Sequence, residues 1–466
     1  MKVQFLGATT EVTGSKFLLT TVKGVKILLD CGMYQGKGLE TDGMNRDLGF
    51  DPKEIDYILL SHAHIDHSGL IPYVVKLGFK GTVFCTPAAR DLCSIMLPDS
   101  GKIQESDTQQ FNKKRARQSL KPVEPIYTMH DAAVSMRQFV SIPYDLPFDI
   151  TPDFSIRFIN SGHMLGSGAI YITYKENRKK KTLCYTGDVG RYNKTILPDP
   201  SAFPQAEYII TESTYGNREH TTIDQAERDL ALVVKDACAK RRGKLIIPSF
   251  AIGRTQEIVY ALQKLKNANN LPDVDIFVDS PLAVSATDIF RLHSDCFNET
   301  MQDYIKVDSD PFGFQNLHYV RSVDDSKRLN NYNRPCIIIS ASGMMEAGRV
   351  KHHLANNIEN PRTTILSVGY CSPTTLGAKI MRGDNTVSIF GVKYKVKATL
   401  ASIEAFSGHA DYKELIKYLS CQKNENLQKI FIVHGDDESR YAYANHLNDA
   451  GFTKSYIPTF RESVEI

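Results

Sequence analysis

Long apolar runs are missing from this chain. No stretch of its 466 residues reaches the ~18 consecutive apolar residues that a membrane-spanning helix needs. The first residues, Met1-Lys2-Val3-Gln4-Phe5-Leu6-Gly7, lack the apolar stretch of a signal peptide and are typical of a strand that ends in a turn. We therefore expect a cytoplasmic protein that does not enter a membrane.

A large charge surplus and paired cysteines are also absent. The 56 Lys+Arg residues against 53 Asp+Glu leave a net charge of only +3, which by itself indicates no nucleic-acid partner. The nine cysteines are scattered without any Cys-x-x-Cys pair, so we expect buried free thiols in a reducing compartment. Any metal must then be held mainly by His, Asp or Glu.

Basic residues gather locally in three clusters, at 113–117, 178–181 and 240–244. Any of them could contact phosphate groups. Each cluster alone is more typical of a solvated helix face or a hairpin turn.

The order of expected elements predicts an α/β protein of several domains. Short strands dominate residues 1–204, whereas strands alternate with helices over 205–395, which is typical of βαβ units and a mostly parallel sheet. Short strands like those of residues 1–204 are expected again over residues 396–466. We expect this last segment to complete the first domain, which makes the middle domain an insertion.

The strongest chemical signal is the run Ser61-His62-Ala63-His64-Ile65-Asp66-His67-Ser68-Gly69, between an expected buried strand and an expected helix. Three imidazoles and a carboxylate within six residues can point into one cavity, and these are the usual zinc ligands where thiolates are absent. His62 and His64 could reach one metal while Asp66 and His67 reach a second.

Three further candidates follow expected strands. His163 comes after Phe158-Ile159-Asn160-Ser161-Gly162, Asp188 after Thr186-Gly187, and His434 after Ile430-Phe431-Ile432-Val433. Each side chain lies next to a glycine at a strand end, where the backbone can turn it into a shared cleft. Singly each would be an ordinary loop residue, so they indicate a two-metal site only as a set.

Together these motifs resemble the metallo-β-lactamase superfamily. His-x-His-x-Asp-His at 62–67 is similar to its signature, and Leu28-Leu29-Asp30-Cys31-Gly32, Gly162-His163 and Thr186-Gly187-Asp188 match its other motifs. The rest of the chain resembles the β-CASP branch, through motifs that begin at Thr211, Pro248, Ser340, Gly348, Phe406 and Val433. The resemblance implies a four-layer αββα sandwich with an inserted β-CASP α/β domain, as in bacterial relatives of the cleavage and polyadenylation specificity endonuclease subunit.

The resemblance also implies roles for individual residues. One zinc ion would be held by His62, His64 and His163, and a second by Asp66, His67 and His434, with Asp188 bridging the two. Asp30 would orient a ligand imidazole. His409 would protonate the leaving 3′ oxygen, held in place by Glu212, so that Asp66, Glu212 and His409 are the expected catalytic residues.

The implied activity is zinc-dependent hydrolysis of single-stranded RNA, in a cleft between the two domains. Endonucleolytic cleavage that leaves a 3′-hydroxyl and a 5′-phosphate is favoured, and 5′-exonucleolytic action is left open. Weaker candidates for substrate contacts are Arg254, which begins an expected helix, and the small-residue turn with Ser340, Ser342 and Gly343, whose backbone N–H groups could take a phosphate. A homodimer is also left open.

Three alternatives remain beside this interpretation. A small-molecule hydrolase of the same fold, such as a thioesterase or lactonase, needs neither a large insertion nor a His409–Glu212 pair. A β-CASP nuclease that acts on DNA would share every motif, because recognition of the ribose 2′-hydroxyl cannot be read from them. A non-catalytic scaffold would have lost metal ligands, and this sequence has all of them.

Overall fold

The computed structural model describes residues 1–36, 39–177, 179–220, 223–369, 371, 374–403 and 407–466. The chain divides into two compact units. The first unit comprises Met1–Tyr192, Asp199–Glu219 and His409–Ile466, and the second comprises Asn193–Pro198 and His220–Gly408. The predicted boundaries of 1–204, 205–395 and 396–466 stay a prediction.

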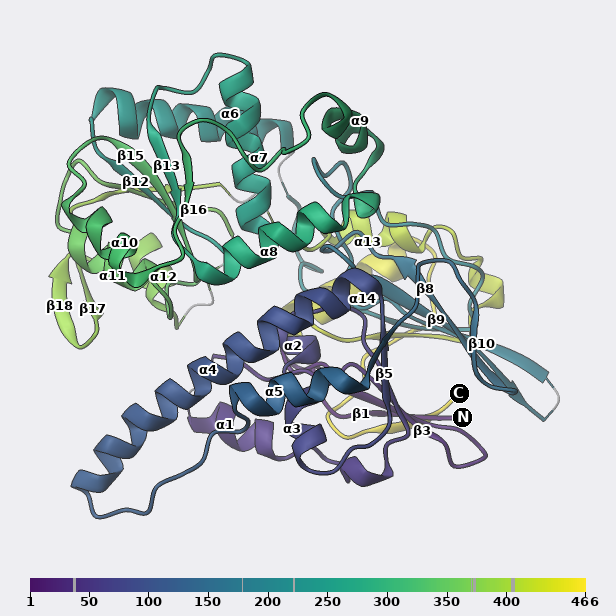
Figure 1. The fold of residues 1–466 in the computed structure, drawn as a ribbon. Coiled ribbons are helices and arrows are strands. Elements are labelled where there is room, and N and C mark those ends of the chain that lie inside the picture. The colour runs from purple at the N-terminus through teal and green to yellow at the C-terminus, as the bar shows by residue number, and fades with distance from the viewer. Residues whose placement is uncertain (37–38, 178, 221–222, 370, 372–373, 404–406) are drawn as a thin grey trace. The chain divides into compact units, whose positions relative to one another are not determined.

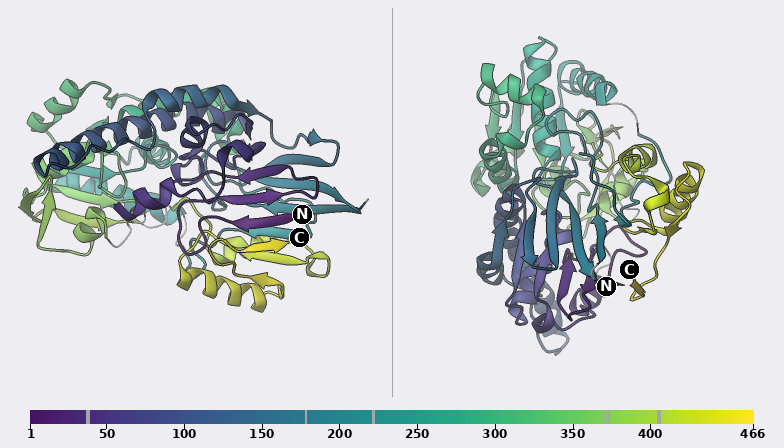
Figure 2. Two further views of the ribbon diagram at one scale, coloured as in Figure 1. Left: turned by 90° about the horizontal axis from the view of Figure 1, so that it is seen from below. Right: turned by 90° about the vertical axis from the view of Figure 1, so that its right-hand side faces the viewer.

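Two seven-stranded sheets form the centre of the first unit (Figure 1). The first sheet contains, in spatial order, β22 (Ser463–Glu465), β1 (Lys2–Phe5), β2 (Phe17–Thr20), β3 (Lys26–Leu29), β4 (Tyr57–Leu59), β5 (Thr82–Cys85) and β6 (Phe139–Ser141). The second contains β21 (Ser455–Tyr456), β20 (Lys429–Ile432), β11 (Tyr208–Thr211), β10 (Lys179–Tyr185), β9 (Gly168–Glu176), β8 (Phe154–Asn160) and β7 (Phe148–Thr151). Because β22 pairs with β1, the two ends of the chain lie side by side (Figure 2).

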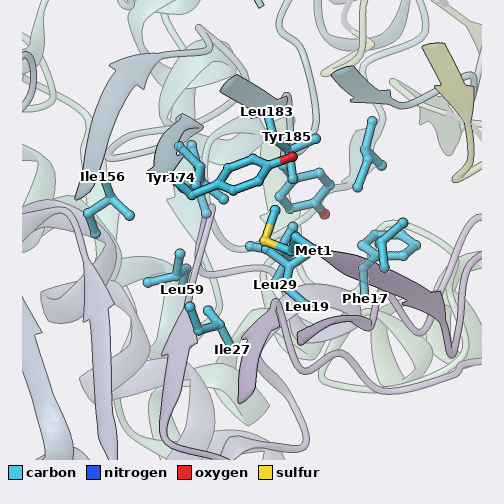
Figure 3. Close-up of a cluster of buried hydrophobic side chains, with 14 of the residues drawn as sticks. Met1, Phe17, Leu19, Ile27, Leu29, Leu59, Ile156, Tyr174, Leu183 and Tyr185 are labelled. Carbon is cyan, nitrogen blue, oxygen red and sulfur yellow. The ribbon is translucent and has the colours of Figure 1, made fainter. Parts of the chain in front are cut away.

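Apolar side chains from both sheets fill the space between them (Figure 3). Along β8 the burial alternates, so that Phe154, Ile156 and Phe158 point inward, as the two-residue period of a strand requires. They belong to the same core as Leu19 and Leu29 of the first sheet. This core fixes how the two sheets face each other and therefore where their edges meet.

Helices cover the outer faces of both sheets (Figure 1). Those that accompany the first sheet are α1 (Leu39–Arg46), α2 (Ile65–Ser68), α3 (Ile71–Lys76), α4 (Pro87–Arg117) and α5 (Met129–Ser135). On the second sheet, α13 (Tyr412–Leu419) and α14 (Asp437–Asp449) bury Leu415, Leu419 and Leu447 against its outer face. The layers are helix, sheet, sheet, helix, which confirms the predicted αββα sandwich.

The second unit is built on a parallel sheet of six strands. In spatial order these are β14 (Leu317–Tyr319), β13 (Asp275–Val278), β15 (Cys336–Ser340), β12 (Lys244–Pro248), β16 (Thr364–Ser367) and β19 (Thr399–Ser402), with a hairpin of β17 (Thr386–Ile389) and β18 (Val392–Lys395) beside them. The strand Cys336-Ile-Ile-Ile-Ser340 is buried throughout, as expected for a parallel strand covered on both faces. The predicted βαβ organisation of the middle segment is confirmed.

The helices of the second unit connect these strands. They are α6 (Ile223–Val234), which continues as a π-helical turn over Lys235–Lys240, α7 (Arg254–Asn267), α8 (Pro281–Leu292), α9 (Glu299–Val307), α10 (Val323–Arg328), α11 (Val350–Asn357) and α12 (Leu376–Met381). One strand differs from the sequence expectation. The sequence places residues 399–403 with the segment that completes the first domain, but β19 pairs with β16 and extends the second unit's sheet.

Within the described residues, no helix combines the length and the apolar character needed to cross a bilayer. All nine cysteines are free, and six of them are buried. The homodimer and the cytoplasmic location stay predictions.

Candidate metal centre

The carboxyl ends of several strands carry the polar side chains of the site. His62 and His64 follow β4, His163 follows β8, Asp188 follows β10, Glu212 follows β11 and His434 follows β20. In the second sheet β8, β10, β11 and β20 run in the same direction, because β8 and β10 are both antiparallel to β9 and the others pair in parallel. Their ends therefore meet at one edge, which gathers ligands that are far apart in the sequence.

Neighbouring segments hold the loop that carries His62, His64, Asp66 and His67 through hydrogen bonds to its backbone carbonyls. The backbone N–H groups of Ser15, Cys31 and Met33 donate to the carbonyls of Asp66, His67 and Ile65 at 2.9, 2.7 and 2.9 Å. Gly32 is required for this approach, since a Cβ atom there would lie 1.6 Å from the Asp66 carbonyl oxygen. These three hydrogen bonds and the close approach at Gly32 position the backbone of the loop.

A buried lysine supports this arrangement from behind. Lys16, the residue directly before β2, is fully buried, and its Nζ donates to the carbonyls of Gly14 and Gly32 at 3.1 Å each. Burial lowers the pKa of Lys16 to about 8. The ammonium also lies 4.3 Å from the centre of the Tyr34 ring. Lys16 therefore links the segment at Gly14 to the segment at Gly32, and both segments contact the loop.

The first group of candidate ligands consists of His62, His64, His163 and Asp188. The His64 Nδ1 atom lies 3.1 Å from Nε2 of both His62 and His163. Asp188 Oδ2 lies 3.5 Å from His62 Nε2 and 3.6 Å from His163 Nε2. One ligand atom from each residue lies within 4.8 Å of all the others, which suits a shared cation.

The second group consists of Asp66, His67 and His434. The Nε2 atoms of His67 and His434 are 3.2 Å apart, and Asp66 Oδ2 is 3.6 Å from His434 Nε2. Asp188 faces this group with its other oxygen, because Oδ1 lies 3.3 Å from His67 Nε2. The structure therefore brings together all seven predicted metal ligands, with Asp188 between the two groups.

Asp188 provides the clearest sign that a cation belongs here. Both of its carboxylate oxygens are buried, and among the described residues neither has a hydrogen-bond partner. An unpaired buried carboxylate is costly unless a cation or donors compensate it. Because imidazole and carboxylate donors surround these oxygens, the residues present fit a metal site.

The protonation of three of the candidate ligand imidazoles agrees with ligand chemistry. Burial lowers the pKa of His62 and His163 well below the usual range and that of His64 to about 4. These rings are therefore neutral at physiological pH, as metal ligands must be. For His67, burial acts downward, but the nearby charges of Asp188 and Asp30 outweigh it and raise its pKa.

Asp30 holds His67 in one orientation. Its Oδ2 lies 2.6 Å from His67 Nδ1, which leaves Nε2 to face the metal position. The carboxylate also accepts hydrogen bonds from Ser61 N and Oγ at 2.7 Å and from the Tyr185 hydroxyl at 2.6 Å. Such support fixes the tautomer and direction of a ligand ring.

His434 has a comparable support in Thr214, whose Oγ1 lies 3.0 Å from His434 Nδ1. The backbones of His434 and Asp30 have φ values of +52° and +54°, which is uncommon for residues other than glycine. Strained conformations of this kind persist where the surrounding contacts enforce them, often at functional sites.

A second constellation lies beside the ligands. His409 Nδ1 is 3.1 and 3.2 Å from the two oxygens of Glu212, and 3.8 Å from Asp188 Oδ2. The Glu212 carboxylate is buried and accepts from the Val189 N–H at 2.6 Å. Burial acts to lower the pKa of His409, but the charges of Glu212 and Asp188 outweigh it and raise the pKa to about 9. The carboxylates of Glu212 and Asp188 thus favour the protonated form of the His409 imidazole beside the candidate metal ligands.

The predicted substrate contacts lie in the second unit, and their roles stay predictions. Arg254 begins α7 and forms an ion pair with Glu257 in the same turn. Ser340 is buried and donates to the Asp279 carbonyl at 2.8 Å. Both side chains are therefore engaged within the protein.

Ser342 and Gly343 remain nearer to the surface. The Ser342 hydroxyl accepts from the Ala347 N–H at 3.2 Å and closes a small turn. A Cβ atom on Gly343 would lie 3.0 Å from the half-exposed Phe250 ring, so a larger residue there would require that ring to shift. The turn packs against the loop after β12, since Ser249 N donates to the Ser340 carbonyl at 3.0 Å.

Four supporting residues were not identified from the sequence: Ser61, Tyr185, Thr214 and Lys16. Ser61 and Tyr185 stand directly before predicted ligand motifs, so their position beside those motifs was a usable signal. Lys16 stands directly before the apolar run Phe17-Leu18-Leu19, and this position was a signal, because lysine is almost never fully buried without partners.

Removal of metal is expected to lower the melting temperature of the protein. A ligand present at 1,000 times its Kd contributes about 4 kcal/mol to folding. For a domain of this size that corresponds to a drop of about 10 °C. Calorimetry of metal-loaded protein with and without a chelator measures it, with metal analysis to verify removal. An unchanged melting temperature after verified removal would contradict a metal site in the core of the first unit.

Comparison with known proteins agrees with this geometry. Residues 15–249 match the family model of the metallo-beta-lactamase superfamily, and residues 255–380 match the Beta-Casp domain. Residues 393–458 match the Zn-dependent metallo-hydrolase RNA specificity domain.

Relatives align over almost the entire chain. A ribonuclease of Thermus thermophilus is 33% identical over 100% of both chains. An RNase J-like protein of Methanocaldococcus jannaschii is 30% identical over 98% of this chain and 97% of its own length. A transcription termination factor of Methanosarcina mazei is 30% identical over 94% of this chain and 67% of its own length.

Proposed function

Because this chain belongs to the metallo-β-lactamase superfamily and carries its β-CASP domain, we propose that it is a metal-dependent ribonuclease that cleaves single-stranded RNA. The observation that carries the proposal is the combined site: a buried carboxylate among imidazoles whose two oxygens have no hydrogen-bond partner among the described residues, and His409 beside it with a raised pKa. Phosphodiester hydrolysis needs both features, because charge develops on the phosphate and a poor leaving group must gain a proton.

The proposal includes two zinc ions. The first would be held by His62, His64 and His163, the second by Asp66, His67 and His434, with Asp188 shared between them. Bound zinc would supply positive charge that lowers the pKa of an attacking water and neutralises charge on the phosphate.

His409 has the role of general acid. Its imidazolium donates a proton to the 3′ oxygen as the P–O3′ bond breaks, so the products are a 3′-hydroxyl and a 5′-phosphate. Glu212 keeps the ring charged and oriented through contacts of 3.1 and 3.2 Å to its Nδ1 atom. This acid distinguishes the site from that of a small-molecule hydrolase, which can release a better leaving group without it.

RNA is favoured over DNA by the comparisons. The match to an RNA specificity domain over residues 393–458 and the names of the relatives, which include a ribonuclease, support an RNA substrate. Internal cleavage is proposed as the main mode, with removal of nucleotides from the 5′ end as a second mode of the same site.

The proposal is tested with zinc-loaded protein and a single-stranded RNA labelled at either end, beside DNA of the same sequence. Internal cuts in RNA that disappear on chelation are the expected result. Mononucleotides released from a 5′ label would show the second mode. Intact RNA in the presence of protein with verified bound zinc would refute a general ribonuclease, and cleavage of DNA at an equal rate would refute the preference for RNA.

A further inference from the structure

The far end of α4 carries a cluster of positive charge that the proposed chemistry does not use. Between residues 113 and 121 the sequence Lys-Lys-Arg-Ala-Arg-Gln-Ser-Leu-Lys contains five cations and no acidic residue. Lys113, Lys114, Arg117 and Lys121 are exposed, and none of them has an ion-pair partner among the described residues. We call these four residues the basic tip.

The basic tip is an ordered structure. Asn112 pairs with both backbone groups of Val123, donating to its carbonyl at 2.8 Å and accepting from its N–H at 2.9 Å. Arg115 Nε donates to the Lys121 carbonyl at 2.7 Å, and its guanidinium lies over the Phe111 ring at 5.6 Å from the ring centre. The chain that returns from the helix is therefore fastened to it.

The contacts between the helix and the returning segment determine which basic side chains are exposed to solvent. Phe111, Asn112 and Arg115 face the returning segment, so the neighbouring Lys113, Lys114 and Arg117 are left toward solvent. Lys113 and Arg117 are four residues apart and lie on one face of the helix. Exposed cations without internal partners are free to meet an external polyanion.

The position of the basic tip relates it to the metal centre. α4 begins at Pro87, next to Thr86, whose hydroxyl donates to the carbonyl of Gly166 in the loop that carries His163. A helix of 31 residues is about 45 Å long. The first turn of α4 is thus held against the loop that carries His163. Its other end lies far from the strands of its own unit, as Figures 1 and 2 show.

We propose that the basic tip binds the phosphate backbone of single-stranded RNA at a distance from the cleaved bond and so holds long substrates. The proposal rests on the ribonuclease function above. Phosphate binding by lysine and arginine is independent of sequence and depends strongly on salt. A short RNA that occupies only the metal centre cannot extend about 45 Å along α4, so only longer RNA gains from the basic tip.

The test compares two double variants with equal changes in charge. Lys113→Gln/Lys114→Gln alters the basic tip. Lys179→Gln/Lys180→Gln alters a pair of exposed lysines in the hairpin of β9 and β10, and serves as the control. Binding of a 40-nucleotide RNA is measured at several salt concentrations, with the zinc-loaded protein in the His409→Ala background so that the RNA stays intact. Cleavage of a 6-nucleotide RNA is measured with His409 present.

Loss of two phosphate contacts is expected to make the slope of log affinity against log salt shallower by about 1.4, and to weaken binding about 25-fold at 0.1 M salt. The control variant should keep the parental slope, and both variants should cleave the short RNA at the unaltered rate.

An unaltered slope in the tip variant, or an equal loss in the control, would overturn the role of the basic tip. A loss of short-RNA cleavage in the tip variant would also overturn it, because the effect would then lie in the metal centre or in folding. If the parent protein neither binds RNA nor cleaves it, the proposed ribonuclease function itself is refuted. A tip variant that loses affinity for anionic phospholipid vesicles but not for RNA would assign the surface to a membrane instead.

Discussion

Replacing Asp188 with asparagine is expected to remove both the bound metal and the cleavage of RNA. Asparagine keeps the shape of the side chain but loses the charge that faces both ligand groups, through Oδ2 at 3.5 Å from His62 and Oδ1 at 3.3 Å from His67. Loss of several kcal/mol of charge stabilisation corresponds to a fall in kcat/KM on the order of 10⁴-fold.

Metal content of the purified protein and the rate of cleavage are measured together for this variant. Asp153→Asn, which removes a carboxylate paired with Lys23 in the same unit, is the matched control and should keep both quantities. An Asp188→Asn protein that retains its metal and its rate would exclude Asp188 as the shared ligand.

Changes at His409 and Glu212 are expected to affect the reaction and leave metal binding intact. His409→Ala should lower kcat by about 10²- to 10⁴-fold, because the leaving oxygen loses its proton donor. The matched control is His446→Ala, since His446 stacks on Tyr412 with ring centres 3.9 Å apart and touches no candidate ligand. A His409→Ala enzyme with the full rate would exclude it as the acid.

Glu212→Gln gives a prediction about pH. A general acid works only while protonated, so activity should fall as the pH rises through the pKa of His409, which is raised to about 9. Burial alone acts to lower that pKa, and the negative charge of Glu212 opposes it. Without this charge the alkaline limb of the pH–rate profile should move to lower pH. If the alkaline limb of the Glu212→Gln variant does not move, a group other than His409 determines it.

The local motifs of the site could be predicted because each is complete within a few residues. The run from Ser61 to Gly69 contains three imidazoles and a carboxylate, which indicate metal binding by themselves. The strands that precede His163, Asp188 and His434 are evident from their apolar residues. The structure brings these side chains together, while their roles as ligands stay predictions. The parallel sheet of the middle segment was predictable from its alternating strands and helices, whereas the αββα sandwich was implied by the family resemblance.

Helix α4 shows a limit of local reasoning. This helix begins at Pro87 and contains Pro98 in its interior. Proline favours the first turn of a helix and usually interrupts its interior. Here the turns before Pro98 bury Leu92, Cys93 and Met96, and this packing maintains the helix through the proline.

The supporting contacts could not be predicted because their partners are far apart in the sequence. Tyr185 and Asp30 are 155 residues apart, and Thr214 and His434 are 220 apart. Such pairs follow from the order of strands in the two sheets, which no local pattern specifies. The same holds for β19, whose partner β16 is reached only after α12 and a hairpin.

The span between His67 and His434 also has a consequence for the timing of synthesis. These two rings face each other at 3.2 Å but are 367 residues apart. At the usual rate of translation, about 5 to 20 residues per second, roughly 20 to 70 s separate the appearance of the one from that of the other. A nascent chain that has already made the His-x-His-x-Asp-His loop therefore lacks His434, which completes the second ligand group, for most of its time on the ribosome. A chain that stops before residue 434 lacks His434 and keeps only Asp66 and His67 of the second ligand group.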